Sequence, residues 1–208
     1  MIKAVIFDCF GVLVDPIFES FWGKVNEKIQ QKIRDIDELA DRGEIPDVAR
    51  EKVVAQLLDE SGLDGRQEID DAYFSSKRRQ DLLDFIKSSR TQFKTGLLSN
   101  VADNIDRIFT PAERAALFDD EVLSYQIHLT KPNPKIYRLA AQRLNIAPRE
   151  CVFVDDKERN IAAAEAVGMC GILYKNFADF REKLNTILAD DNHQNDNNRD
   201  AFFAKGGE

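Results

Sequence analysis

Cysteine is scarce in this chain, whose three cysteines, Cys9, Cys151 and Cys170, form an odd set without a Cys-x-x-Cys pair. Each stands in apolar or strand-like sequence, and this pattern does not predict a disulfide framework. Because disulfides are rare in reducing compartments, the scarcity favours a cytoplasmic protein.

An excess of basic residues is also missing, since the net charge is -8 and the isoelectric point is near 5.0. Proteins that bind nucleic acid present basic stripes to the phosphates, so small-molecule partners are expected instead. No run of about 18 apolar residues is present to span a membrane. Lys3, Asp8 and Asp15 interrupt the apolar opening segment, which argues against a secretory signal. The sequence does not indicate an oligomeric state.

The hydrophobic content and the length of the chain suffice for one folded domain with an insertion, because 43% of the 208 residues are hydrophobic. Short apolar runs predict buried strands at 2–7, 93–98, 151–154 and 171–174. Helical patterns between them, at 101–109, 111–116, 135–144, 160–167 and 179–188, indicate a parallel sheet with crossover helices. The predicted fold is a three-layer, doubly wound α/β domain, whose strand ends line one crevice.

A helical insertion interrupts this pattern between the first and second strands. Helical periodicity predicts helices at 17–39, 46–61, 67–76 and 78–88. In the second of these, the pattern places Asp47, Arg50 and Glu51 outward, and Val48, Val53, Val54 and Leu57 inward. The predicted core is therefore 1–15 and 90–188, the cap is 16–89, and the polar tail 189–208 is expected to be mobile.

Polar residues follow the predicted strands. Asp8 ends the first strand and Gly11 permits a tight turn behind it, so its carboxylate could be a nucleophile, a metal ligand or a simple turn residue. Ser99 and Asn100 could bind oxyanion oxygens or cap a helix. Lys131 stands in a proline-braced loop, where it could bind phosphate or remain solvated. The adjacent Asp155 and Asp156 repel each other, and Mg²⁺ would relieve that repulsion, although a simple acidic turn is also possible.

With these motifs in view, the sequence resembles the haloacid-dehalogenase-like hydrolase superfamily, in the subgroup with a small helical cap. The segments that carry the resemblance are VIFDCFGVLVD, GLLSN, KPNPKIY and VFVDDKERNIAAAEAVGM. They span residues 1 to about 188, and jointly they are highly specific. Within the superfamily, the chain is similar to bacterial sugar-phosphate phosphatases of the glucose-1-phosphatase type, whose cap also carries a turn like Arg42-Gly43-Glu44.

The resemblance implies a role for each motif residue in a phosphohydrolase that acts on small phosphorylated metabolites. Asp8 would be the nucleophile that becomes an aspartyl-phosphate, Ser99 and Lys131 would hold the phosphate, and Asn100 would position the substrate. Mg²⁺ would be bound by Asp8, the backbone carbonyl of Phe10 and Asp156, with Asp155 close by or acting through a water.

One position departs from the family pattern, because Phe10 stands where phosphatases of the superfamily commonly carry a second aspartate. A general acid/base of this kind contributes about 10²–10⁴ in rate, so the leaving group must be protonated by another residue or need little help. The first case would make His128 the side chain to remove, and the second predicts a steep dependence on leaving-group pKa. Two alternatives stay open: a 2-haloacid dehalogenase, and a non-catalytic binding protein.

Substrate choice is expected to lie in the cap, which carries no diagnostic motif. The candidates for facing the site are Phe18, Phe21, Trp22, Arg42, Tyr73 and Phe74.

Overall fold

A parallel sheet organises the protein in the computed structural model, which describes residues 1–17 and 19–204. Its strands are β1 (Ala4–Phe7), β2 (Lys94–Ser99), β3 (Asp120–Leu123), β4 (Cys151–Asp155) and β5 (Cys170–Leu173). They lie in the order β3-β2-β1-β4-β5, and all pairs are parallel. The predicted α/β sheet is therefore confirmed. β3 was not predicted, because its sequence Asp-Glu-Val-Leu lacks an apolar run.

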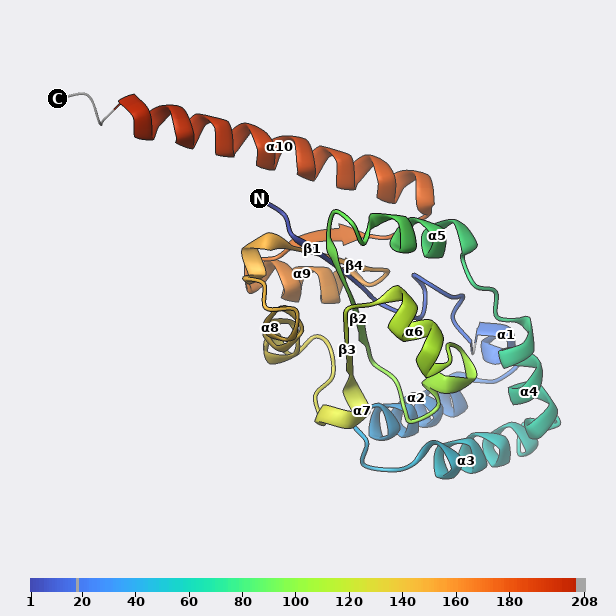
Figure 1. Ribbon diagram of the computed structural model, residues 1–208. Helices are drawn as coiled ribbons and strands as arrows, with labels where there is room; N and C mark the ends of the chain where they lie inside the picture. The colour runs from blue at the N-terminus through green and yellow to red at the C-terminus, as the bar shows by residue number, and fades with distance from the viewer. Residues whose placement is uncertain (18, 205–208) are drawn as a thin grey trace.

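Helices cover both faces of this sheet (Figure 1). The helices of the sheet domain are α5 (Gln80–Ser89), η1 (Ile105–Arg107), α6 (Pro111–Leu117), α7 (Ser124–Ile127), α8 (Pro134–Arg143), η2 (Pro148–Glu150), α9 (Glu158–Ala166) and α10 (Phe177–Ala204). The segment 101–109, predicted as a helix, is mostly loop around η1. The predicted helix 179–188 is the first part of the longer α10.

Strand β1 lies at the centre of the sheet and is buried on both sides, which explains its continuous apolar sequence. Val5 and Phe7 pack with the core that includes α5, α6 and α10, whereas Ala4 and Ile6 pack with the core beneath α8 and α9. Alternate side chains of β1 thus point to opposite faces of the sheet. Each face packs against its own helices, and the result is a three-layer domain.

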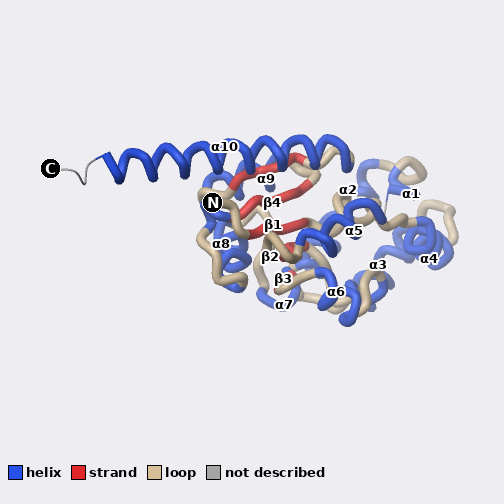
Figure 2. Tube along the Cα trace, turned by 45° about the horizontal axis from the view of Figure 1, so that its top comes forward, coloured by secondary structure: helices blue, strands red, loops and turns tan. Residues whose placement is uncertain are grey.

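The insertion carries α1 (Glu19–Trp22), α2 (Glu27–Asp41), α3 (Asp47–Asp59) and α4 (Gly65–Ser75). Figures 1 and 2 both show these helices grouped at one side of the sheet domain. The sequence predicted one helix over 17–39, but α2 begins only after Asn26, whose side chain accepts a hydrogen bond from the Ile29 amide at 3.1 Å. An asparagine in this cap position satisfies an amide at the start of the helix, so the segment divides there.

The orientation predicted for α3 is wrong at several positions. Arg50 is 3% exposed and Asp47 is buried with it, while Val48 is 75% exposed. Val54 and Leu57 are buried as predicted. The polar pair can be buried because Arg50 Nε donates to Asp47 Oδ1 at 2.6 Å, so neither charge is left uncompensated. Helical periodicity alone could not distinguish this paired, buried polar face from a solvated one.

Helix α5 packs against the sheet domain although the sequence grouped it with the cap. Phe85 of α5 contacts Phe180 of α10 edge-on, with ring centroids 5.2 Å apart. We therefore propose that the cap ends before α5 rather than at residue 89. The C-terminal part of α10 extends beyond the sheet in both views (Figures 1 and 2), and the mobility expected for 189–208 stays a prediction. Within the described ranges, no helix has the length and apolar character to cross a bilayer.

The core beneath α10 provides a test of this packing. Phe180 is fully buried against Phe7, Phe85 and Tyr174. Phe180→Ala should lower the free energy of unfolding by about 3–5 kcal/mol in urea titrations, because it leaves a cavity. The matched control is Phe74→Ala on the 94% exposed ring, which should change the unfolding free energy by less than about 0.5 kcal/mol. Equal effects would show that α10 does not close this core.

Candidate active site

The predicted site residues converge at the carboxyl ends of the parallel strands. Asp8 follows β1, Ser99 ends β2 with Asn100 next to it, and Asp155 ends β4 with Asp156 next to it. Lys131 arrives from the loop between α7 and α8, beyond β3. Because these strands are neighbours in the sheet, residues distant in sequence reach one crevice.

Lys131 lies between two buried carboxylates. Its Nζ is 2.6 Å from Asp8 Oδ1 and 2.8 Å from Asp155 Oδ2, and all three side chains are buried. Burial alone would lower the pKa of Lys131, but the two carboxylates outweigh it and raise the pKa above its ordinary value. The ammonium therefore stays charged, and it is shared between two acids.

This sharing leaves the two carboxylates in different states. Burial opposes ionisation of Asp155, but Lys131, the Lys157 amide and the Asn160 side chain hold the pKa of Asp155 below its ordinary value. Burial raises the pKa of Asp8, and Lys131 only partly opposes this effect. One ammonium thus does not fully compensate the cluster, and a further positive charge would stabilise the ionised form of Asp8.

Asp156 completes a cluster of carboxylates. Ligand oxygens of Asp8, Asp155 and Asp156 all lie within 4.8 Å of one another. Asp156 Oδ1 is buried and has no hydrogen-bond partner among the described residues, whereas both oxygens of Asp155 accept hydrogen bonds. A buried carboxylate oxygen without a donor is costly unless a cation approaches it. Oxygen ligands in this number suit Mg²⁺, with Asp156 the better placed of the adjacent pair.

Gly11 makes room for this arrangement. Its φ is +86°, and a Cβ at this position would collide with the carboxylate of Asp156. The loop after β1 can therefore pass against the Asp156 carboxylate only with glycine there.

The phosphate-binding candidates Ser99 and Asn100 make different contacts in the structure. The Asn100 side chain donates to the Lys131 carbonyl at 3.1 Å and accepts from the Lys131 amide at 2.8 Å, which ties the two loops together. The Ser99 hydroxyl is buried and lies 3.4 Å from the Asn100 carbonyl. The Asn100 side chain therefore fixes the Lys131 loop, while the substrate positioning expected of Asn100 and the phosphate binding expected of Ser99 stay predictions.

A cavity of about 270 Å³ opens above these residues. Asp8, Phe10, Asn100 and Lys131 line it, whereas Ser99, Asp155 and Asp156 do not. Of the cap candidates, Trp22 and Tyr73 line the cavity. Phe21 is core, Phe74 is exposed, Arg42 pairs with Glu38 and Glu44, and Phe18 lies outside the described residues.

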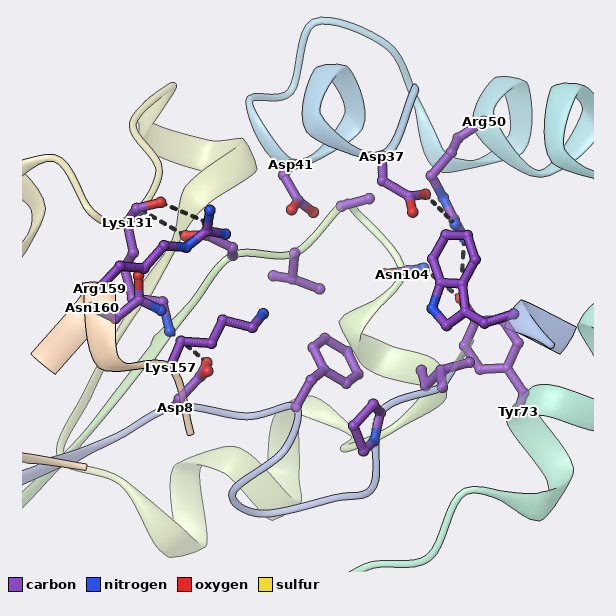
Figure 3. A pocket seen from close by; sticks show the side chains of 17 residues that line it. Asp8, Asp37, Asp41, Arg50, Tyr73, Asn104, Lys131, Lys157, Arg159 and Asn160 are labelled. Carbon is purple, nitrogen blue, oxygen red and sulfur yellow. Dashed lines mark hydrogen bonds and ion pairs between the residues drawn. The ribbon is translucent and has the colours of Figure 1, made fainter. Parts of the chain in front are cut away.

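The cap supplies a polar wall that the sequence did not reveal. Figure 3 shows Asp37, Asp41 and Arg50 on the opposite side of the cavity from Asp8. Arg50 Nη1 is 3.0 Å from Asp37 Oδ1, and Asn104 Nδ2 donates to the Tyr73 hydroxyl at 2.6 Å. Asp37 and Asp41 are four residues apart on one helix, where like charges repel each other, but this spacing alone does not show what the two residues face.

Comparison with known proteins identifies the family. The family model of haloacid dehalogenase-like hydrolases matches residues 2–168, and the chain belongs to this family. The D-ribitol-5-phosphate phosphatase of Bacteroides thetaiotaomicron is 29% identical, over 90% of this chain and 99% of its own.

Solved structures agree on the fold. The HAD family enzyme bt-2542 from Bacteroides thetaiotaomicron, solved as an Asp-to-Ala mutant with magnesium and inorganic phosphate, has a TM-score of 0.66, with 23% identity over 84% of this chain and 95% of its own. A 2-haloacid dehalogenase from Pseudomonas syringae has a TM-score of 0.56, with 20% identity over 85% and 90%. The fold is thus shared by phosphate-binding and dehalogenating enzymes, so the reaction must be inferred from the site.

The Lys131 ion pairs can be tested through stability. Lys131→Met should lower the free energy of unfolding at neutral pH by about 3–5 kcal/mol, because two buried carboxylates lose their cation. Adding Asp8→Asn to this variant should recover part of the loss. Lys135→Met, at an exposed position of α8, is the control and should change stability by less than about 0.5 kcal/mol. Additive losses in the double variant would contradict the pairing.

Proposed function

We propose that this protein is a magnesium-dependent phosphohydrolase that acts on small phosphorylated carbohydrates through an aspartyl-phosphate at Asp8. The observation that carries the proposal is the position of Asp8. Its carboxylate lies at the wall of the cavity, against Lys131 and close to the carboxylates of Asp155 and Asp156. A nucleophile, a phosphate-binding cation and oxygen ligands for a metal thus meet at one point.

Mg²⁺ would be held by Asp8, the backbone carbonyl of Phe10 and Asp156. The unpartnered Asp156 Oδ1 supports this choice, whereas the saturated oxygens of Asp155 favour an indirect role for that residue. When bound, the metal would neutralise negative charge on the phosphoryl group and on the acid cluster.

The residues of the chain would then divide the reaction between them. An Asp8 oxygen attacks phosphorus, the bond to the leaving oxygen breaks, and water later releases phosphate from Asp8. Lys131 offsets the charge of the phosphoryl oxygens and, through Asp155, is held in a fixed position. Asn100 fixes the Lys131 loop through its side-chain amide and lines the cavity, where it would help to position the substrate.

The substrate class rests on the cap wall and on the relatives. The wall carries hydroxyl, amide and carboxylate groups, which bind hydroxyl groups well, and its Arg50 guanidinium is already paired with Asp37. A phosphorylated sugar or sugar alcohol fits this chemistry, and a relative that matches most of the chain is a D-ribitol-5-phosphate phosphatase.

Dehalogenation is the weaker alternative. Phe10 followed by Gly11 resembles dehalogenases, and one of these enzymes shares the fold. A dehalogenase needs no metal, however, whereas the close carboxylates of Asp8, Asp155 and the half-buried Asp156 suit a cation.

The nucleophile is tested by Asp8→Asn, which should be inactive on every phosphate ester because an amide does not form the aspartyl-phosphate. Steady-state assays with a panel of sugar phosphates, run beside 2-haloacids, measure this effect. Asp15→Asn, a neighbouring acid on the same loop, should retain turnover. Hydrolysis by the Asp8→Asn variant would mean that water attacks the substrate directly, and turnover of 2-haloacids by the parent would favour the dehalogenase.

The metal is tested by chelation and by Asp156→Asn. Chelator should abolish turnover, and Asp156→Asn should weaken Mg²⁺ binding by at least about tenfold, since even outer partners of metal ligands have effects of this size. Titration calorimetry measures the affinity, and circular dichroism checks the fold. Glu158→Gln, an exposed acid at the start of α9, should leave the affinity unchanged. Full activity in chelator would refute metal dependence.

A further inference from the structure

Asp41, the last residue of α2, lines the cavity on the cap side. Its carboxylate makes no hydrogen bond or ion pair with any residue that the structure describes. Asp37, one turn earlier, is instead paired with Arg50 at 3.0 Å. Figure 3 shows the Asp41 side chain directed into the space across from Asp8 and joined to none of the side chains drawn there.

Contacts with the sheet domain hold this end of α2 in place. Gly43 has a φ of +68°, and a Cβ there would collide with the Tyr125 carbonyl oxygen. His128 Nδ1 is 2.7 Å from the carbonyl oxygen of Arg42. The turn after Asp41 is therefore pressed against α7 and the residue after it, although the turn belongs to the cap.

The charged groups that face Asp41 come from several elements. Asp37 lies on the same helix, Arg50 comes from α3, and Lys131 and Lys157 come from the sheet domain. Burial and the neighbouring Asp37 raise the pKa of Asp41 to about 7, while Arg50 and the two lysines oppose them. Both protonation states of Asp41 are therefore accessible near neutral pH, as proton transfer in both directions requires.

We propose that Asp41 is the general acid and base of the reaction, in the role that Phe10 cannot fill. The inference rests on the proposed phosphohydrolase function and deepens it. Neighbouring groups are less suited: His128 is exposed and outside the cavity lining, and Asp37 is engaged with Arg50.

In the proposed reaction, Asp41 gives up one proton in the first step and regains one in the second. In the first, Asp8 attacks phosphorus, the bond to the leaving oxygen breaks, and the Asp41 carboxyl group transfers its proton to that oxygen, giving an alcohol. In the second, water attacks phosphorus, the Asp41 carboxylate accepts the water proton, and the bond to Asp8 breaks. Inorganic phosphate leaves, and both aspartates return to their starting states.

The test compares leaving groups in the parent and in Asp41→Asn, with Mg²⁺ and under single-turnover conditions. An alkyl phosphate needs a proton on its leaving oxygen, so its rate should fall by about 10²–10⁴ in the variant. The rate compared is release of the leaving group in the first step, because the second step is the same for every ester. For p-nitrophenyl phosphate, whose leaving group is a stable anion, the loss should be less than about tenfold. The parent should therefore show a shallow dependence on leaving-group pKa, in place of the steep one expected from Phe10 alone.

Asp37→Asn is the matched control, since it removes a carboxylate from the same helix and the same wall. It should lower the rates on alkyl and aryl esters by one common factor. Phe10→Asp in the Asp41→Asn background should restore alkyl ester hydrolysis selectively. Urea unfolding verifies that each variant is folded.

The pH profile gives an independent readout. The first step needs protonated Asp41, so alkyl ester hydrolysis by the parent should decline as the pH rises through about 7, and this limb should vanish in Asp41→Asn. Equal losses on both esters in a folded Asp41→Asn protein, with the pH limb retained, would overturn the assignment of Asp41 alone. A parent without magnesium-dependent turnover of any ester would overturn the proposed function itself.

Discussion

The contact between the Lys131 ammonium and the carboxylates of Asp8 and Asp155 is the interaction on which the site depends. It joins the ends of β1 and β4 to the loop beyond β3, three parts of the chain that only the parallel sheet brings together. Because one cation serves two acids, the cluster retains an excess of negative charge. That excess, rather than any single residue, would favour a divalent cation in the crevice, as the proposed function requires.

The sheet and the site residues at its edge could be predicted from sequence because their signals are local. A buried central strand must be apolar on both faces, and a polar residue directly after it marks the strand end, as Asp8 and Asp155 do. β3 escaped prediction because its first residues are acidic and only Val122 and Leu123 are fully buried. The start of α2 was not predicted, because a single capping residue, Asn26, determines where the helix begins.

The cap wall could not be predicted, because its residues pair across helices. Asp47 and Arg50 look like a solvated face when α3 is considered alone. Only the approach of α2, α4 and the loop after β2 brings Asp37, Tyr73 and Asn104 into reach of this face. Pairwise burial of charge depends on tertiary distances, and no periodicity within one helix encodes them.

The loop after β2 contacts both sides of the cavity, the Lys131 loop on one side and the cap on the other. Asn100 at its start is bonded to the Lys131 loop, while Asp103 accepts a hydrogen bond from the Asp47 amide and Asn104 donates to Asp47 and Tyr73 of the cap. Residues 100–104 thus hold the Lys131 loop and the cap helices through one short stretch of backbone. A substitution that shifts this backbone would therefore displace the Lys131 loop and the cap wall together, although the two lie on opposite sides of the cavity.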